Sequence, residues 1–148
     1  MRVLLQRVQS ASVQVDGTKI SEINKGVLIL LGITHGDGEK DTRQLLEKII
    51  NLRIFEGESG KLDLSLQDIK GEILLVSQFT LYGVCDKGRR PDFGLAAPIE
   101  EAKKVYEQAV EIFKQCGLKI ECGQFQAHMK VELINDGPLT LMLESKKI

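Results

Sequence analysis

The apolar run VLILLGI at residues 27–33 predicts a strand that is buried on both faces, because it offers no polar side chain to solvent. A strand of this kind lies inside a sheet and needs a packed layer on each side. Turn signals bound the run: Asn24-Lys25-Gly26 precedes it, and residues 34–40 follow it as a loop with two glycines. We therefore expect the rest of the fold to be arranged around residues 27–33.

Antiparallel strands are predicted on the N-terminal side of this run. Residues 3–8 and 11–15 alternate apolar and polar side chains, and Asp16-Gly17 is a hairpin signal that leads into residues 18–23. The last third of the chain predicts further strands at residues 118–122, 129–134 and 139–144.

Two helices are predicted between these groups of strands. Asp41 is expected to cap the first helix, and Pro98 is expected to begin the second, which ends near Cys116 with Gly117 as its stop signal. A strand at residues 72–81 lies between the two helices. The predicted apolar stripes are Leu45, Leu46, Ile49, Ile50 and Leu52 on the first helix, and Ile99, Ala102, Val105, Ala109, Ile112, Phe113 and Cys116 on the second.

This order of elements predicts a single α+β domain over residues 1–148. The sheet is expected to be mixed and mostly antiparallel, and to form an open, barrel-like core covered by the two helices. Because two helices cover only one side of such a sheet, another strand face is expected to close on itself or on a second subunit.

The composition is that of an ordinary globular protein, with 43% hydrophobic and 28% charged residues. A net charge of -1 argues against a protein that coats DNA or RNA, because phosphate neutralisation needs a basic excess. The longest apolar run is far shorter than the ~20 residues of a membrane span. The three cysteines form no C-x-x-C pair, which predicts reduced thiols in a cytoplasmic protein.

Most motifs that carry chemistry are missing from the sequence. The histidines His35 and His128 have no metal-ligand spacing, so neither a metal nor a cofactor is predicted. The glycines of residues 57–62 are too closely spaced for a phosphate loop, and this segment is interpreted as a turn. Cys85 has no histidine nearby in the sequence to activate it.

Two segments are better candidates for a site. Ser77-Gln78-Phe79-Thr80 ends a buried strand with polar groups at the edge of a dry core, where hydrogen bonds are strong. Strand alternation would place Ser77 and Phe79 on one face and Gln78 and Thr80 on the other, although the segment can also be read as a strand emerging into solvent. Asn135-Asp136-Gly137-Pro138 is either a hairpin turn or a cis Gly137-Pro138 bond that fixes two carbonyl groups.

Taken together, these segments resemble the D-aminoacyl-tRNA deacylase family. The resemblance covers essentially the whole chain and depends on the order and separation of its motifs. These are Met1-Arg2-Val3, Gln6-Arg7-Val8, SQFTLYG at residues 77–83, Lys87-Gly88 with Arg90-Pro91, Met129-Lys130-Val131, and NDGP at residues 135–138.

The resemblance implies a cytoplasmic homodimer that hydrolyses the ester joining a D-amino acid, or glycine, to the 3′-terminal adenosine of tRNA. Such an enzyme is a proofreading hydrolase of translation that binds RNA, needs no cofactor, and has neither DNA nor a membrane as partner. Enantiomers would be separated by excluding the L side chain.

The same resemblance assigns roles to residues. Ser77, Gln78, Phe79 and Thr80 would line the reaction centre, where the Phe79 N–H donates to the developing oxyanion. The 2′-hydroxyl of the terminal ribose, in place of Thr80, would activate water. A cis Gly137-Pro138 peptide would enter the active site of the other subunit and bind the α-amino group with its carbonyls.

The remaining implied residues support the pocket or bind RNA. Arg7 would brace the Gly137-Pro138 loop, with Asn135 in the same motif, while Phe125 would lie near the adenine and Met129 beside the pocket. Lys87, Arg89 and Arg90 are expected to contact tRNA phosphates, with a solvated loop as the alternative.

Three residues depart from the pattern of the family. Small residues are expected where this chain has Gln126 and Asp92, and valine where it has Leu139. Gln126 is expected to affect the mouth of the pocket. Two other functions stay open from the sequence: a noncatalytic nucleic-acid-binding module, and a dimeric interaction protein.

Overall fold

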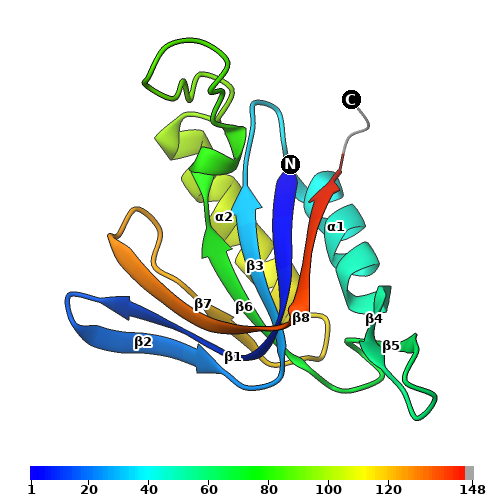
Figure 1. The fold of residues 1–148 in the computed structure, drawn as a ribbon. Coiled ribbons are helices and arrows are strands. Elements are labelled where there is room, and N and C mark those ends of the chain that lie inside the picture. Colours follow the sequence, from blue (N-terminus) through cyan, green and yellow to red (C-terminus); the bar gives the residue numbers. More distant parts are fainter. Residues whose placement is uncertain (146–148) are drawn as a thin grey trace.

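A mixed sheet with two helices on one face makes up the fold, as the computed structural model of residues 1–145 shows (Figure 1). The predicted α+β class is confirmed. In chain order the elements are β1 (Arg2–Val15), β2 (Thr18–Ile23), β3 (Gly26–Gly32), α1 (Glu39–Asn51), β4 (Arg53–Glu56), β5 (Leu62–Ser65), β6 (Glu72–Ser77), the 3-10 helix η1 (Phe79–Tyr82), α2 (Ile99–Lys114), β7 (Ile120–Cys122) and β8 (Met129–Glu144).

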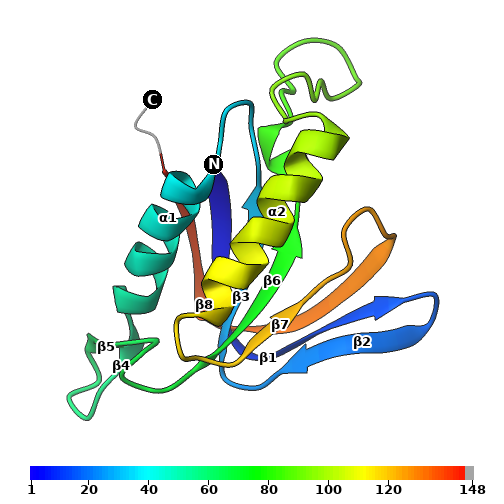
Figure 2. The same cartoon turned by 180° about the vertical axis from the view of Figure 1, so that it is seen from behind.

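The strand order of the main sheet is β2-β1-β3-β6-β7, and β8 pairs with the other edge of β1. The pairs β3–β6 and β6–β7 are parallel, whereas β1 is antiparallel to each of its partners. Parallel neighbours need a crossover, and here the two crossovers contain α1 and α2. Seen from behind, both helices therefore lie on the same face of the sheet (Figure 2).

The apolar run at residues 27–33 is buried on both faces, as predicted. Val27, Ile29 and Leu31 pack in the core beneath the helices. Leu28 belongs to a second core with Leu74 of β6 and other side chains from β1 and β2. The central strands therefore have no solvent-facing side, which accounts for a strand without alternating polar residues.

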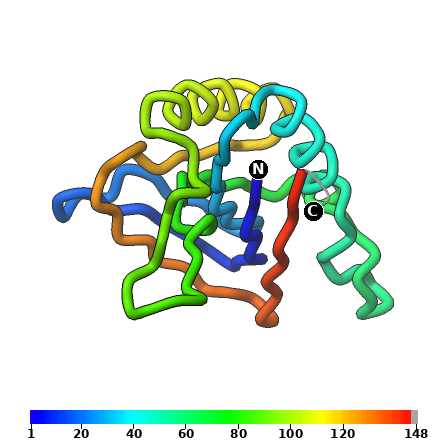
Figure 3. The backbone as a smooth tube through the Cα atoms, turned by 90° about the horizontal axis from the view of Figure 1, so that it is seen from above, coloured from blue at the N-terminus to red at the C-terminus, as the bar shows by residue number. Residues whose placement is uncertain are grey.

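The second core exists because β1 is long and bent. Its residues 2–8 pair with β3, and its residues 11–15 extend beyond β3 to pair with β2. With β2 and β8, this outer half swings over the second face of β3 and β6 to make a nearly closed barrel, which is seen from above in Figure 3. The two strands predicted at residues 3–8 and 11–15 are thus halves of one strand.

Of the two alternatives for Asn135-Asp136-Gly137-Pro138, the hairpin turn is wrong, and the Gly137-Pro138 bond is cis. Residues 129–144 form the single strand β8, which pairs with β1 on both sides of this dipeptide, Leu133 opposite Ala11 and Thr140 opposite Gln6. The register shifts between these pairs. The Asp-Gly signal therefore marks a bulge inside a long strand, where the chain departs from the ladder and then rejoins it.

Both helices differ slightly from prediction at their ends: Pro98, the expected first residue of the second helix, caps α2, which begins at Ile99. α1 begins at Glu39 behind Gly38, and Asp41 lies within its first turn, where its carboxylate accepts the Gly38 N–H at 3.1 Å. α2 ends at Lys114, slightly before the predicted Cys116. The predicted burial of Ile99 is wrong, because this first residue of α2 is 56% exposed.

Residues 53–65 form the small hairpin β4–β5, which the sequence did not predict. The glycine-containing segment at residues 57–62 is the turn of this hairpin, as expected, and the Gly57 N–H donates to the Lys61 carbonyl at 3.1 Å.

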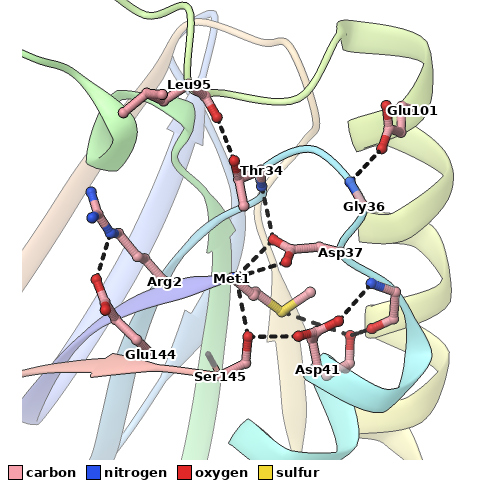
Figure 4. Close-up of polar contacts among 12 residues, drawn as sticks. Met1, Arg2, Thr34, Gly36, Asp37, Asp41, Leu95, Glu101, Glu144 and Ser145 are labelled. Carbon is pink, nitrogen blue, oxygen red and sulfur yellow. Dashed lines mark hydrogen bonds and ion pairs between the residues drawn. The ribbon is translucent and has the colours of Figure 1, made fainter. Parts of the chain in front are cut away.

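Buried polar contacts fasten Met1 and Ser145 to the loop after β3 (Figure 4). The α-ammonium of Met1 lies 2.8 Å from an Asp37 carboxylate oxygen and 3.1 Å from the Ser145 hydroxyl. Asp37 also accepts the Thr34 N–H, and the Thr34 hydroxyl donates to the Leu95 carbonyl at 2.5 Å. These bonds position residues 94–97, of which Ala96 and Ala97 line a cavity at the end of β6.

A candidate active site at the end of β6

The predicted strand at residues 72–81 is shorter than expected, because β6 ends at Ser77 and the chain turns into η1. The Gln78 N–H still donates to the Leu31 carbonyl at 2.8 Å. Gly32 permits the close approach of η1, since a Cβ there would lie 3.0 Å from the Cβ of Leu81 and 3.1 Å from the Gln78 carbonyl. The predicted alternation of faces from Ser77 to Thr80 is therefore wrong.

A cavity of about 710 Å³ lies where β6 ends. Ser77, Gln78 and Phe79 line it, as do residues 125–129, which lead into β8. The start of α2 closes another side. Most of the lining is apolar, and its polar side chains are Ser77, Gln78, Gln126 and His128. The cavity thus presents a few polar groups against an apolar surface, as ligand sites commonly do.

Tyr106 of α2 supports Phe125, which lines the cavity. The two ring centroids lie 5.6 Å apart, and the buried Tyr106 hydroxyl donates to the Leu75 carbonyl at 3.0 Å. Burial raises the pKa of Tyr106, so its phenol stays protonated near neutral pH. Sequence reasoning missed Tyr106, although its spacing from Ala102 and Ala109 puts it on the same face of α2.

Thr80 lies in η1, outside the lining of the cavity, and its side chain is exposed. The Gln78 amide donates a hydrogen bond to the Thr80 hydroxyl. The N–H of Phe79, at the start of η1, has no hydrogen-bond partner among residues 1–145, as expected for the first turn of a helix. It is a donor available to a ligand.

Among residues 1–145, no group of three or more His, Cys, Asp or Glu side chains is arranged to hold a metal ion. Burial raises the pKa of the Cys122 thiol, which makes it less reactive. Cys85 is exposed in the loop after η1.

The bulge of β8 lies outside the cavity of its own chain. Its Gly137-Pro138 peptide bond is cis, and both residues are exposed. Arg7 lies beneath the bulge: its Nε donates to the Asp136 carbonyl at 3.0 Å, and a Cβ on Gly137 would lie 2.7 Å from its Nη2. Asn135 accepts the Leu139 N–H at 3.2 Å, which closes the bulge from the other side.

The basic residues Lys87, Arg89 and Arg90 are exposed in the loop between η1 and α2, which projects beyond the sheet at the top of Figure 1. Hydrogen bonds of 2.8 and 2.9 Å between the backbones of Val84 and Asp92 close the base of this loop. The Asp92 carboxylate accepts the Gly94 N–H at 2.6 Å, so one of its oxygens is directed toward the backbone.

The fold thus brings some predicted site residues together and keeps others apart. The cavity unites Ser77, Gln78, Phe79, Phe125 and Met129. Within one chain, Arg7, Asn135 and Gly137-Pro138 form a separate group on β1 and β8. The roles assigned to all of these residues stay predictions.

No helix in the described part of the chain is both long enough and apolar enough to span a membrane.

Comparisons with known proteins point to one family. A family model described as D-Tyr-tRNA(Tyr) deacylase matches residues 4–144. A curated protein of Thermosipho africanus, named D-aminoacyl-tRNA deacylase, is 55% identical over 148 residues, which cover 100% of this chain and 99% of that protein.

Two solved structures share the fold. One, named c-Myc DNA Unwinding Element Binding Protein, is 45% identical and has a TM-score of 0.92 over 99% of this chain and 100% of its own. The other, described as a probable eukaryotic D-amino acid tRNA deacylase, has a TM-score of 0.81 over 97% of this chain and 98% of its own. At 17% identity, this second likeness shows the fold alone.

Proposed function

The chain belongs to the D-Tyr-tRNA(Tyr) deacylase family, and from this we propose that it hydrolyses the ester bond of D-aminoacyl-tRNA. Water attacks the ester carbonyl carbon, the bond from that carbon to the ribose oxygen breaks, and the ribose oxygen takes up a proton. The products are a free D-amino acid and tRNA. The enzyme is a carboxylic ester hydrolase that corrects chirality errors before translation.

The Phe79 N–H is the group we assign to the developing oxyanion. Phe79 lines the cavity and its N–H has no partner among residues 1–145, so this donor is available to the carbonyl oxygen as charge builds up. A donor held by the backbone needs no rearrangement at the moment of reaction. The hydrogen bond from the Gln78 N–H to the Leu31 carbonyl holds this turn in place.

We assign activation of water to the 2′-hydroxyl of the terminal ribose. The Ser77 hydroxyl lines the cavity, but within residues 1–145 it has no hydrogen bond to a base, and Thr80 bonds to Gln78. This assignment makes the RNA a participant in the reaction. It also implies that a 2′-deoxy terminus is a poor substrate.

The selection of D over L substrates is assigned to Gly137-Pro138 of a second copy of the chain. This peptide is exposed, outside the cavity of its own chain, and held from below by Arg7. Its carbonyls would bind the α-amino group in the partner's cavity and leave no space for an L side chain. Glycine, which has no side chain, would also be accepted.

A homodimer follows from this division of the site between two chains, because a two-fold axis generates two equivalent sites. In the single chain, Ile134 and Met142 of β8 are 55% and 52% exposed. Large apolar side chains exposed in this way are typical of a surface that a second subunit covers. The expected location is the cytoplasm, where aminoacyl-tRNA is used.

The observation that carries this proposal is the cavity shared by Ser77, Gln78 and Phe79 with Phe125 and Met129, in a chain 55% identical over its full length to a D-aminoacyl-tRNA deacylase. The test is to incubate the purified protein with D-aminoacyl-, L-aminoacyl- and glycyl-tRNA and to follow loss of the ester. We expect hydrolysis of the D and glycyl esters only. Equal rates for D and L, or no hydrolysis, would reject the proposal.

A noncatalytic nucleic-acid-binding module is the second candidate, favoured by the name of one solved relative, c-Myc DNA Unwinding Element Binding Protein. The net charge of -1 counts against binding that depends mainly on phosphates. Mobility-shift measurements with duplex DNA would separate the two: we expect no complex at salt concentrations at which the esterase activity is measured.

A further inference from the structure

The exposed aromatic side chains of the protein lie together at one place. Of the five phenylalanines and two tyrosines, Phe55, Tyr82, Tyr106 and Phe113 are buried, and Phe125 is half-buried. The remaining two, Phe79 and Phe93, are 56% and 37% exposed and contact each other edge to face at 5.0 Å between centroids. Both residues line the cavity.

Two exposed aliphatic side chains extend this surface. Leu95 and Ile99 are 52% and 56% exposed, and Ile99 also lines the cavity. Four of the eight exposed large apolar side chains of the described chain thus belong to one region, the apolar rim, defined as Phe79, Phe93, Leu95 and Ile99. Isolated exposed apolar residues need no explanation, but a cluster at the mouth of a cavity indicates a binding surface.

The apolar rim continues into the basic loop. Lys87, Arg89 and Arg90 are exposed in the same loop as Phe93 and Leu95, and none of the three has an ion-pair partner among residues 1–145. Asp86 is also exposed, and Asp92 accepts the Gly94 N–H, so the loop keeps a local excess of one positive charge in a protein of net charge -1.

We propose that the apolar rim and the basic loop bind the unpaired nucleotides that precede the 3′-terminal nucleotide of an RNA. Aromatic and aliphatic side chains stack on bases of any sequence, and Lys and Arg contact the phosphates between them. The inference rests on the proposed function, because the terminal nucleotide then occupies the cavity that Phe79, Phe93 and Ile99 of the rim help to line. It adds a place for the adjoining single strand.

This surface explains how a protein with a net charge of -1 holds a large RNA. The whole duplex region need not be bound if a few unpaired nucleotides stack at the mouth of the cavity. The Thr34–Leu95 hydrogen bond and the Val84–Asp92 backbone pair hold the loop in place beside it. Affinity is therefore expected to depend on single-stranded character more than on sequence.

The test measures binding and does not depend on catalysis. A fluorescent RNA hairpin with four unpaired 3′ nucleotides is titrated with the full-length protein, beside the same hairpin with a blunt end. We expect the tailed hairpin to bind at least 10-fold more tightly, and Phe93→Ser to remove most of this difference. Phe93→Tyr keeps an aromatic face and is expected to restore it.

A matched pair of leucines controls for loss of apolar surface. Leu95→Ser is expected to weaken binding of the tailed hairpin about 5-fold, whereas Leu62→Ser, at a residue 49% exposed on β5, leaves it unchanged. Replacing Arg89 and Arg90 by Ser is expected to lower the slope of log affinity against log salt by about 0.7 per charge. Circular dichroism confirms that each variant is folded.

Each alternative outcome overturns the inference. Equal affinity for the tailed and blunt hairpins means that the surface does not bind the unpaired nucleotides. If Leu95→Ser changes the sedimentation coefficient of the protein and leaves RNA binding intact, the rim contacts a second copy of the chain. Hydrolysis of D-aminoacyl-tRNA is assayed separately, so failure of the proposed function is distinguished from failure of the RNA surface.

Discussion

Arg7 and Asp136 are joined across β1 and β8: the Nε of Arg7 donates to the backbone carbonyl of Asp136 at 3.0 Å. The same guanidinium donates through Nη1 to the Ile54 carbonyl at 2.6 Å and is only 8% exposed. One buried cation therefore connects the bulge of β8 with β4. It holds Gly137-Pro138 in place without any contact to the cavity of its own chain.

Replacement of Arg7 is expected to affect both stability and activity. Arg7→Met removes the donors to the buried Ile54 carbonyl and the partly buried Asp136 carbonyl, which costs about 1–3 kcal/mol for the first and less for the second. Urea denaturation should show a loss of this order in the free energy of unfolding. Deacylation should fall further than stability explains, because the Gly137-Pro138 peptide loses its support.

Arg43→Met is the matched control for this change. Arg43 forms an exposed i,i+4 ion pair with Glu39 on α1, and such pairs contribute about 0.3–0.5 kcal/mol. Equal losses of stability in the two variants would contradict the structural role assigned to Arg7.

Thr80→Ala separates the RNA-assisted mechanism from a protein nucleophile. The Thr80 hydroxyl accepts the Gln78 amide, so its removal perturbs a neighbour but no proposed reacting group. We expect kcat to change less than about 10-fold, since loss of a nucleophile costs far more. If Thr80→Ala is folded but inactive while Thr80→Ser is active, the hydroxyl at residue 80 is the nucleophile and the RNA-assisted mechanism is wrong.

Gln126 has a φ of 62°, a conformation that glycine adopts more easily, and its side chain lines the cavity. Gln126→Gly is expected to raise the free energy of unfolding by about 0.5–1 kcal/mol, because the left-handed backbone costs glycine nothing. It should also change KM for aminoacyl-tRNA, since an amide is lost from the mouth of the cavity.

The control for this variant is Gln124→Gly, at an exposed residue whose φ is not positive. It should lower stability by about 0.4–1 kcal/mol, because glycine adds freedom to the unfolded chain. Thermal unfolding of the two variants should therefore show a higher stability than the wild type for Gln126→Gly and a lower stability for Gln124→Gly. A loss of stability in Gln126→Gly would show that the Gln126 side chain contributes more than its backbone conformation costs.

The raised pKa of Tyr82 predicts that the stability of the protein falls at alkaline pH. Burial raises its pKa to about 12, the charge of Asp37 adds to this shift, and Arg2, 4.6 Å from the ring centroid, opposes it. A pKa raised by folding stabilises the protein fully below the unfolded value of 10.0, and this contribution is lost as pH rises toward 12.

The measurement is the free energy of unfolding at pH values between 9 and 12, for the wild type and Tyr82→Phe. Relative to the variant, the wild type should lose about 1.4 kcal/mol per pH unit within the titration window. Parallel pH profiles for the two proteins would contradict the raised pKa.

Local patterns predicted most elements of the fold but not how far they extend. Alternation identified both halves of β1, yet only pairing with β3, β2 and β8 makes them one strand. Asp136-Gly137 had the composition of a hairpin turn, but the ladder with β1 continues on both sides of it. Tertiary pairing overrides local turn propensity wherever a neighbouring strand satisfies the backbone.

The site shows the same division. The motifs at residues 77–83 and 135–138 were visible in the sequence, because residue types and their order need no coordinates. The positions of Tyr106 behind Phe125 and of Phe93 against Phe79 were not, since these contacts join separate elements.

The chain order of apolar and polar residues was sufficient to establish the class of fold, the doubly buried strand at residues 27–33 and the two candidate segments, because periodicity and turn chemistry act between near neighbours. The separation of Gly137-Pro138 from the cavity of its own chain required the folded protein. So did the gathering of both exposed aromatic rings at the mouth of that cavity. Both depend on where a bent sheet places residues that are distant in sequence, and no local pattern encodes that bend.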